Sequence, residues 1–230
     1  MVLGKHVGLN VPQLRQLASG ALLHDIGKVL IPKAIVDKPS RLTPEEWSHM
    51  RRHPELGYHL LRSLGSWQII PFHVVYQHHE RQDGNGYPRG LKGLNTVYRT
   101  TEQERGHILL VAEICSVADV FDALTSDRPY RPGLSAEEAL NIIASGAGTT
   151  FNKEVVEAFQ SITPPYPIGC RVVVHNGTLE GYQATVIETP PQHPARPVIR
   201  LVKDASGQPI PPADICLVDE PEVRLSTAPL

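Results

Sequence analysis

The fold of this chain is decided by residues 11–28, which read Val-Pro-Gln-Leu-Arg-Gln-Leu-Ala-Ser-Gly-Ala-Leu-Leu-His-Asp-Ile-Gly-Lys. Apolar side chains at positions 14, 17, 18, 21 and 22 recur with the spacing of one helix face. We therefore predict a helix over residues 11–23 that runs directly into His24 and Asp25. This pattern places an imidazole and a carboxylate at the edge of a hydrophobic core.

Helix signals continue over roughly the first 160 residues. Thr43 and Glu46 form a capping box with Pro44 at the first helical position, which predicts a helix from there to about Leu61. The remaining signals are apolar periodicity over residues 67–80 and 102–124, a capping box at Ser135 and Glu138, and a cap at Asn152 before a short helix that ends at Phe159. Residues 83–88, Asp-Gly-Asn-Gly-Tyr-Pro, cannot lie inside a helix.

The pattern changes at residues 163–167, which read Thr-Pro-Pro-Tyr-Pro. Short β-branched runs follow at 171–175, 184–188, 198–202 and 215–218, with turn signals at 176–177 and 204–207. We interpret this segment as a small all-β unit in the form of a partly open barrel. The predicted fold is mainly α, a helical domain over residues 1–162 with a small β-rich appendage over residues 163–230.

Composition narrows the possible functions. The net charge of −2, from 22 basic and 24 acidic residues, excludes a general polyanion binder, so any phosphate must be recognised by a local cluster. Three cysteines lie far apart and form no CxxC pair, which fits a reducing cytoplasm and gives no zinc-thiolate site. No apolar run approaches the roughly 18 residues of a membrane span, so no membrane segment is predicted in this chain.

Six imidazoles and carboxylates form the candidate chemistry: His24, Asp25, His53, His78, His79 and Asp119. Asp119 lies in the apolar stretch 117–121, where burying it is costly unless a cation or a donor compensates it. Adjacent helical residues point about 100° apart, so a His-His pair suits two neighbouring ions better than one. Asp25 could bridge two such ions at a separation of about 3.5–4 Å.

Each of these residues also has a purely structural reading. A lone core histidine is usually a hydrogen-bonded residue, and Asp119 alone could be a buried hydrogen-bonding aspartate. All six fall in one predicted domain, and together they favour a metal site. Imidazole with carboxylate and no thiolate suits iron or manganese.

Four segments resemble a known family. Residues 22–28 look like the HDIGK signature of the HD superfamily of metal phosphohydrolases, and residues 53–57 resemble its HPxxG block. Residues 78–88 are similar to the HHExxDGxGYP signature of the HD-GYP branch, and residues 118–131 resemble the third block of that branch. The resemblance covers roughly residues 18–159.

The resemblance implies an HD-type helical bundle that hydrolyses cyclic di-GMP to linear pGpG or GMP, by a metal-bridged hydroxide at a binuclear or trinuclear iron or manganese site. It implies that the metal ligands are His24, Asp25, His53, His78, His79 and Asp119. Asp25 and Lys28 would be catalytic, and the residues that contact or flank the substrate would be Lys28, Gly84, Gly86, Tyr87, Arg128 and Arg131. Implied partners are the cyclic dinucleotide and a diguanylate cyclase (GGDEF) or sensor domain, with no large nucleic acid.

The chain departs from the family pattern in three places. HD proteins carry a further histidine on a helix well upstream of His24, a position that precedes Met1, so we expect the chain to lack that first helix. The family also has an arginine where this chain has Glu113, and residues 95–107 look like an insertion near the site. Two alternatives remain: a catalytically inactive receptor or protein-interaction module, and an HD phosphohydrolase for another nucleotide.

Overall fold

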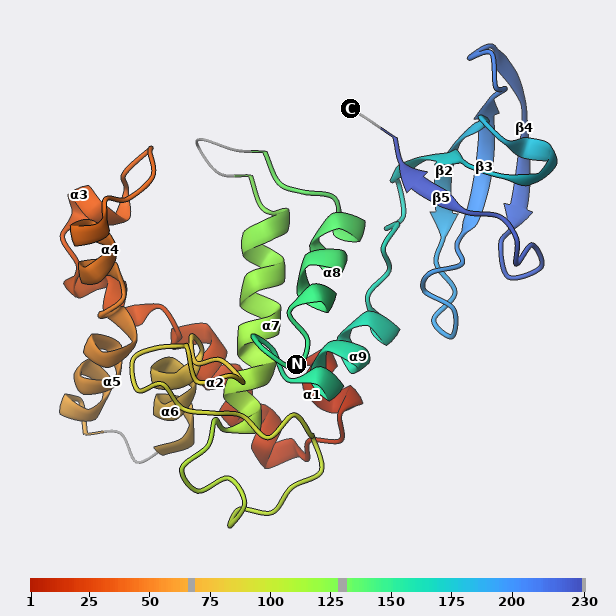
Figure 1. The fold of residues 1–230 in the computed structure, drawn as a ribbon. Coiled ribbons are helices and arrows are strands. Elements are labelled where there is room, and N and C mark those ends of the chain that lie inside the picture. The colour runs from red at the N-terminus through yellow and green to blue at the C-terminus, as the bar shows by residue number, and fades with distance from the viewer. Residues whose placement is uncertain (66–68, 128–131, 229–230) are drawn as a thin grey trace. The chain divides into compact units, whose positions relative to one another are not determined.

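A computed structural model describes residues 1–65, 69–127 and 132–228 of the chain (Figure 1). The chain divides into two compact units, the first made of residues 1–133 and 143–159 and the second of residues 134–142 and 160–230. The first unit is helical and the second is built around an antiparallel sheet. The prediction of a mainly α fold with a C-terminal β segment is confirmed.

The helical unit contains the predicted helices in their predicted order, together with shorter elements that were not predicted. They are α1 (Val2–His6), α2 (Val11–Leu23), the 3-10 helix η1 (Ile26–Leu30), α3 (Lys33–Val36), α4 (Pro44–Met50), α5 (His53–Ser63), α6 (Ile69–Gln77), α7 (Leu110–Thr125), the end of α8 (Ala136–Ser145) and most of α9 (Lys153–Ile162). The elements that were not predicted are α1, η1 and α3. The predicted bounds of α2 are confirmed, as are the helix caps at Thr43, Ser135 and Asn152.

Helix α6 forms the centre of the helical core, packing against α2, α5 and α7 (Figure 1). Its Val74 and Val75 are fully buried. Gly20 of α2 lies so close to α6 that a Cβ atom on it would come within 2.5 Å of the Val74 Cβ. The end of α2, which His24 and Asp25 follow, is therefore held tightly against the helix that precedes His78.

The prediction of one helix from Thr43 to Leu61 is wrong, because the structure has two helices separated at Arg51 and Arg52. Pro54 explains the break, since a proline has no N–H to bond the carbonyl four residues earlier and its ring clashes with that carbonyl. Here that carbonyl belongs to Met50, and it accepts a hydrogen bond from His53 Nδ1 at 2.8 Å instead. The break therefore helps to orient a predicted metal ligand.

The predicted helix over residues 102–124 begins only at Leu110. Residues 101–106 form turns, and Gly106 has a φ of +78°, in the left-handed region that glycine tolerates best. Helix α6 similarly ends at Gln77, so His78 and His79 lie in the turn after the helix rather than within it.

The second unit has a sheet with the order β4-β3-β2-β1-β5, in which all neighbours are antiparallel. The strands are β1 (Arg171–Val174), β2 (Gln183–Glu188), β3 (Val198–Lys203), β4 (Pro209–Cys216) and β5 (Leu225–Thr227). The predicted strand over residues 215–218 overlaps only the end of β4, which begins at Pro209 and ends at Cys216. The three prolines of β4 argue against a strand in the sequence. They are tolerated in the structure because β4 is an edge strand.

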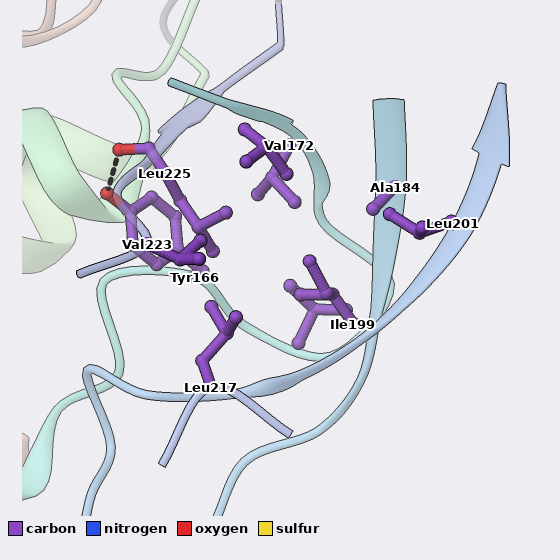
Figure 2. Close-up of a cluster of buried hydrophobic side chains, with 10 residues drawn as sticks. Tyr166, Val172, Ala184, Ile199, Leu201, Leu217, Val223 and Leu225 are labelled. Atoms are coloured by element: carbon purple, nitrogen blue, oxygen red, sulfur yellow. Dashed lines mark hydrogen bonds between the residues drawn. The ribbon is translucent and has the colours of Figure 1, made fainter. Parts of the chain in front are cut away.

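The sheet covers its own apolar core (Figure 2), whose buried members include Val172, Ile199 and Leu217. The Tyr166 hydroxyl lies 2.8 Å from the Leu225 carbonyl oxygen and 2.7 Å from Glu137 Oε1. The first residues of α8 therefore belong with the sheet. The division after residue 162 stays a prediction.

Candidate metal centre

Four segments of the helical unit supply the predicted ligands. His24 and Asp25 follow α2, His53 begins α5, His78 and His79 follow α6, and Asp119 lies on α7. Gly27 explains how the first two segments meet, because a Cβ atom there would lie 1.9 Å from the His53 carbonyl oxygen. Only glycine allows η1 to lie against the start of α5 at this distance.

Asp25 lies at the middle of the cluster. Its Oδ2 is 3.4 Å from His24 Nε2, and its Oδ1 is 3.3 Å from His53 Nε2 and 4.0 Å from His78 Nε2. Asp119 Oδ1 lies 3.3 Å from His24 Nε2. Two sets of ligand atoms, each within 4.8 Å of one another, result: His53 with His78 and His79, and His24 with Asp25 and His78.

Three of the histidines are oriented by the backbone. Each places Nδ1 at a carbonyl oxygen three residues earlier: His24 at Ala21 (2.7 Å), His53 at Met50 (2.8 Å) and His78 at Val75 (2.8 Å). A carbonyl only accepts, so Nδ1 is the donor and Nε2 of the neutral ring carries a lone pair. Metal-binding histidines are commonly oriented by such a bond from the second ring nitrogen.

These lone pairs converge. The Nε2 atoms of His53 and His78 lie 3.2 Å apart, and both side chains are buried. Two lone pairs at this distance repel unless a proton or a metal ion lies between them. The donor chemistry of the cluster therefore fits a cation, and the cluster can hold metal ions.

The pKa shifts of the cluster also indicate that it favours a positive charge. Hydrogen bonding to Asp119, and then to Asp25, raises the pKa of His24 to about 10. Burial alone would raise the pKa of Asp25, but its hydrogen bonds with His24, His53 and Lys28 hold it well below its usual range. Burial also lowers the pKa of His79 to about 3. Burial therefore favours a neutral His79, while the carboxylates of Asp25 and Asp119 favour a proton or a cation beside them.

The glycine-rich loop begins at His79. The Tyr87 amide donates to the His79 carbonyl oxygen at 3.2 Å, and the two rings stack with centroids 4.7 Å apart. Gly86 is enclosed, since a Cβ atom there would lie 2.4 Å from the Arg81 nitrogen. Gly84 has a φ of +82°. The structure therefore brings Tyr87 to the ligands and requires glycine at both positions.

The predicted phosphate contacts are only partly described. Lys28 Nζ lies 2.5 Å from Asp25 Oδ2, so its ammonium group is at the cluster. Arg128 and Arg131 lie outside the described residues.

Three buried polar residues around the histidine pair were missed by sequence reasoning: Gln77, Glu80 and Gln82. The Glu80 carboxylate accepts hydrogen bonds from the backbone amides of Arg89 (2.7 Å) and Leu91 (2.8 Å). These bonds hold the loop that follows the His78–His79 pair. Gln77 Oε1 accepts the Leu109 amide at 2.9 Å. The signal in the sequence was a polar side chain within an apolar helix and turn. The hydrogen-bond partners could not be identified in this way, because they are 9 to 32 residues away along the chain.

Residues 95–107 enter a second polar cluster around Glu113, which we call the Glu113 cluster and define as Gln82, Arg99, Glu113 and Asn152. Glu113 accepts from Arg99 Nη2 at 2.6 Å, Gln82 Nε2 at 2.8 Å and Asn152 Nδ2 at 2.9 Å. The Arg99 and Glu113 side chains are 1% and 2% exposed. The segment that looked like an insertion thus supplies the cation that compensates Glu113.

A family model described as HD domain matches residues 1–155. The match covers more than half of the chain, and the four segments of the cluster lie within it. The chain belongs to the HD domain family.

Several curated relatives are similar. The chain is 38% identical over 179 residues to cyclic di-GMP phosphodiesterase PA4108 of Pseudomonas aeruginosa, which covers 78% of this chain and 40% of the relative. It is 40% identical over 158 residues to a cyclic di-GMP phosphodiesterase of Thermotoga maritima, covering 68% and 40%. It is 35% identical over 144 residues to 3'3'-cGAMP-specific phosphodiesterase 3 of Vibrio cholerae, covering 63% and 28%.

One solved structure shares the fold. Bd1817, a HDG"Y"P protein from Bdellovibrio bacteriovorus, aligns with a TM-score of 0.53 at 22% identity, covering 70% of this chain and 47% of that one. The chain spans about 40% of the length of the first two relatives. Among the described residues, no helix has both the length and the apolar character needed to cross a membrane.

Proposed function

We propose that this chain is a metal-dependent phosphodiesterase that hydrolyses cyclic di-GMP to linear pGpG, with a second cleavage giving GMP. The observation that carries the proposal is the convergence of the His53 and His78 Nε2 atoms, 3.2 Å apart, beside Asp25. The names of the relatives support the substrate class, and the family supports the use of metal ions.

The proposed ligands are His24, Asp25, His53, His78, His79 and Asp119, with iron or manganese ions as their occupants. Bound ions would supply the acidity that activates a water molecule and part of the charge that balances the phosphate. Asp25 has one oxygen toward His24 and the other toward His53, which suits a carboxylate shared by two ions.

Lys28 is proposed to neutralise charge on the phosphate oxygens as the phosphorus is attacked. Its ammonium already lies beside Asp25, so it can reach a phosphate at the same ions. Gly84, Gly86 and Tyr87 are proposed to border the substrate, and the assignment of Arg128 and Arg131 to phosphate stays a prediction. A GGDEF or sensor partner also stays a prediction.

The test combines metal analysis with hydrolysis. Protein purified from cells supplemented with iron or manganese should contain at least one transition-metal ion per chain and should cleave cyclic di-GMP. Chromatography of reactions with cyclic di-GMP, 3'3'-cGAMP and linear pGpG would identify the substrate. A folded protein with no transition metal under either condition would refute the proposal, and exclusive cleavage of another nucleotide would correct the substrate.

We also propose that the helical unit holds the metal ions without the β-rich segment. All proposed ligands precede residue 120, and the sheet has its own core. A fragment of residues 1–163 should bind metal and melt cooperatively. It would lose the partners of Glu137 at Tyr166 and Thr227, so some loss of stability in α8 is expected. An aggregated fragment, or one without metal, would refute independence.

A further inference from the structure

Arg51 lies in the break between α4 and α5, two residues before the ligand His53. Its side chain is exposed, and its guanidinium carbon lies 4.6 Å from the centroid of the Tyr87 ring. Tyr87 in turn stacks on the ligand His79. The positive charge of Arg51 is therefore linked to the predicted metal ligands through two ring contacts, Arg51 with Tyr87 and Tyr87 with His79.

This guanidinium has an aromatic partner but no acidic one among the residues that the structure describes. Within the described parts of the chain, no hydrogen bond or ion pair is found for its side chain. By contrast, Lys28 is paired with Asp25, and Arg99 with Glu113. The positive charge of Arg51 is therefore available to a ligand.

The contact with the Tyr87 ring leaves the N–H donors of Arg51 without a partner among the described residues. A guanidinium that lies over a ring uses its face, while its five N–H groups point outward in its plane. In that plane it can bind a phosphate with two parallel hydrogen bonds. Ring contact also restricts the side chain, so less rotamer entropy is lost on binding.

We propose that Arg51 binds the second phosphate of the cyclic dinucleotide, the one that is not being cleaved. This assignment rests on the proposed function. A cyclic dinucleotide carries two phosphodiester groups, and Lys28 and the ligand cluster can serve only the one at the reaction centre. Arg51 would hold the other and so favour cyclic dinucleotides over diesters with a single phosphate.

The experiment compares Arg51→Ala and Arg51→Lys with Arg62→Ala. Arg62 is a matched control because it also lies over a tyrosine, Tyr58, at 5.7 Å. It sits nine residues beyond His53 on α5, about 14 Å along the helix axis. Each variant is assayed for metal content, for kcat and KM with cyclic di-GMP, and for hydrolysis of bis(p-nitrophenyl) phosphate, which has one phosphate.

Arg51→Ala should raise the KM for cyclic di-GMP about 10- to 100-fold, the range of a lost charge-assisted contact. Metal content should stay at the wild-type level, and the loss on bis(p-nitrophenyl) phosphate should be much smaller. Arg51→Lys should fall between Arg51→Ala and wild type, since a lysine keeps the charge without the planar fork. Arg62→Ala should behave as wild type.

An unchanged KM, or equal losses on both substrates, would overturn the proposal. Equal losses would mean that Arg51 acts only by supporting Tyr87 and His79. The Kd of cyclic di-GMP, measured by calorimetry, separates this inference from the proposed function. A wild-type protein that binds the dinucleotide without cleaving it refutes the activity, and Arg51→Ala must still weaken that binding for the Arg51 assignment to stand.

Discussion

Two carboxylates on helix α7 have opposite surroundings. Glu113 is buried and accepts from three side chains, whose shortest distances are 2.6, 2.8 and 2.9 Å. Asp119, six residues later, has its Oδ1 3.3 Å from His24 Nε2. The two positions lie about 120° apart around the helix axis, so one helix serves both. Glu113 is neutralised by the protein itself, whereas the cluster around Asp119 is arranged for a cation from outside.

The balance of donors and acceptors separates a structural charge from a functional one in this helix. Burial and polar character do not distinguish the two sites, because both contain side chains that are almost fully buried. The distinguishing feature is the balance of donors and lone pairs. A closed network stabilises the fold, and a cluster with converging lone pairs is expected to bind a metal ion.

The largest effect is expected at the metal cluster itself. Asp25→Ala should abolish hydrolysis and remove most of the bound metal, because Asp25 contacts three of the histidines. Metal content and turnover are measured together on the purified variant. Asp37→Ala, at an exposed carboxylate paired with Lys33, is the control and should change neither. Full metal occupancy with near-normal turnover in Asp25→Ala would remove Asp25 from the ligand set.

The next largest effect is expected in the Glu113 cluster, and it should appear as stability. Glu113→Ala removes the nearer of the two carboxylates that pair with the buried Arg99, leaving Glu104 at 3.2 Å, and also removes the acceptor of Gln82 and Asn152. The change should cost about 3–5 kcal/mol of unfolding free energy. Urea unfolding of the metal-free protein measures the change. The double variant Arg99→Ala, Glu113→Ala should lose less than the sum of the single variants. If Glu113→Ala lowered the unfolding free energy by less than about 1 kcal/mol, Arg99 and Glu113 would behave as an exposed ion pair and not as a buried one.

A smaller effect in free energy is expected at Lys28. Lys28→Ala should lower kcat about 10²- to 10³-fold while metal content stays near the wild-type value, because the ammonium is proposed to act on phosphate. Lys33→Ala, at a lysine whose side chain is 91% exposed, should have no effect on either quantity. Loss of metal in Lys28→Ala would show that the lysine acts by holding Asp25 instead.

The smallest effect is expected in the sheet unit. Tyr166→Phe removes a buried hydroxyl that has one proton and two possible acceptors, Glu137 and Leu225. The unfolding free energy should fall by about 0.5–1.5 kcal/mol, with no change in metal content or turnover. Tyr98→Phe, at a side chain that is 87% exposed, provides the control for thermal melts. A loss of metal in Tyr166→Phe would mean that the two units are coupled.

Sequence patterns anticipated the local elements better than their limits. The spacing of apolar residues predicted α2 with its observed bounds, and three caps were recognised because a capping bond joins residues only three apart. The missed break before His53 had its signal in Pro54. Strand β4 was misplaced because its prolines argue against a strand unless its edge position is known.

Short contiguous motifs specify which residue types are available for metal binding and in what order, so these could be predicted before the fold was known. The tertiary structure decided that the Nε2 atoms of His53 and His78 meet beside Asp25, and that Glu113 is closed by Arg99 and Asn152. The physical reason is separation along the chain. Partners 14 to 39 residues apart are brought together only when the helices pack, and no local pattern encodes which polar side chains will face each other.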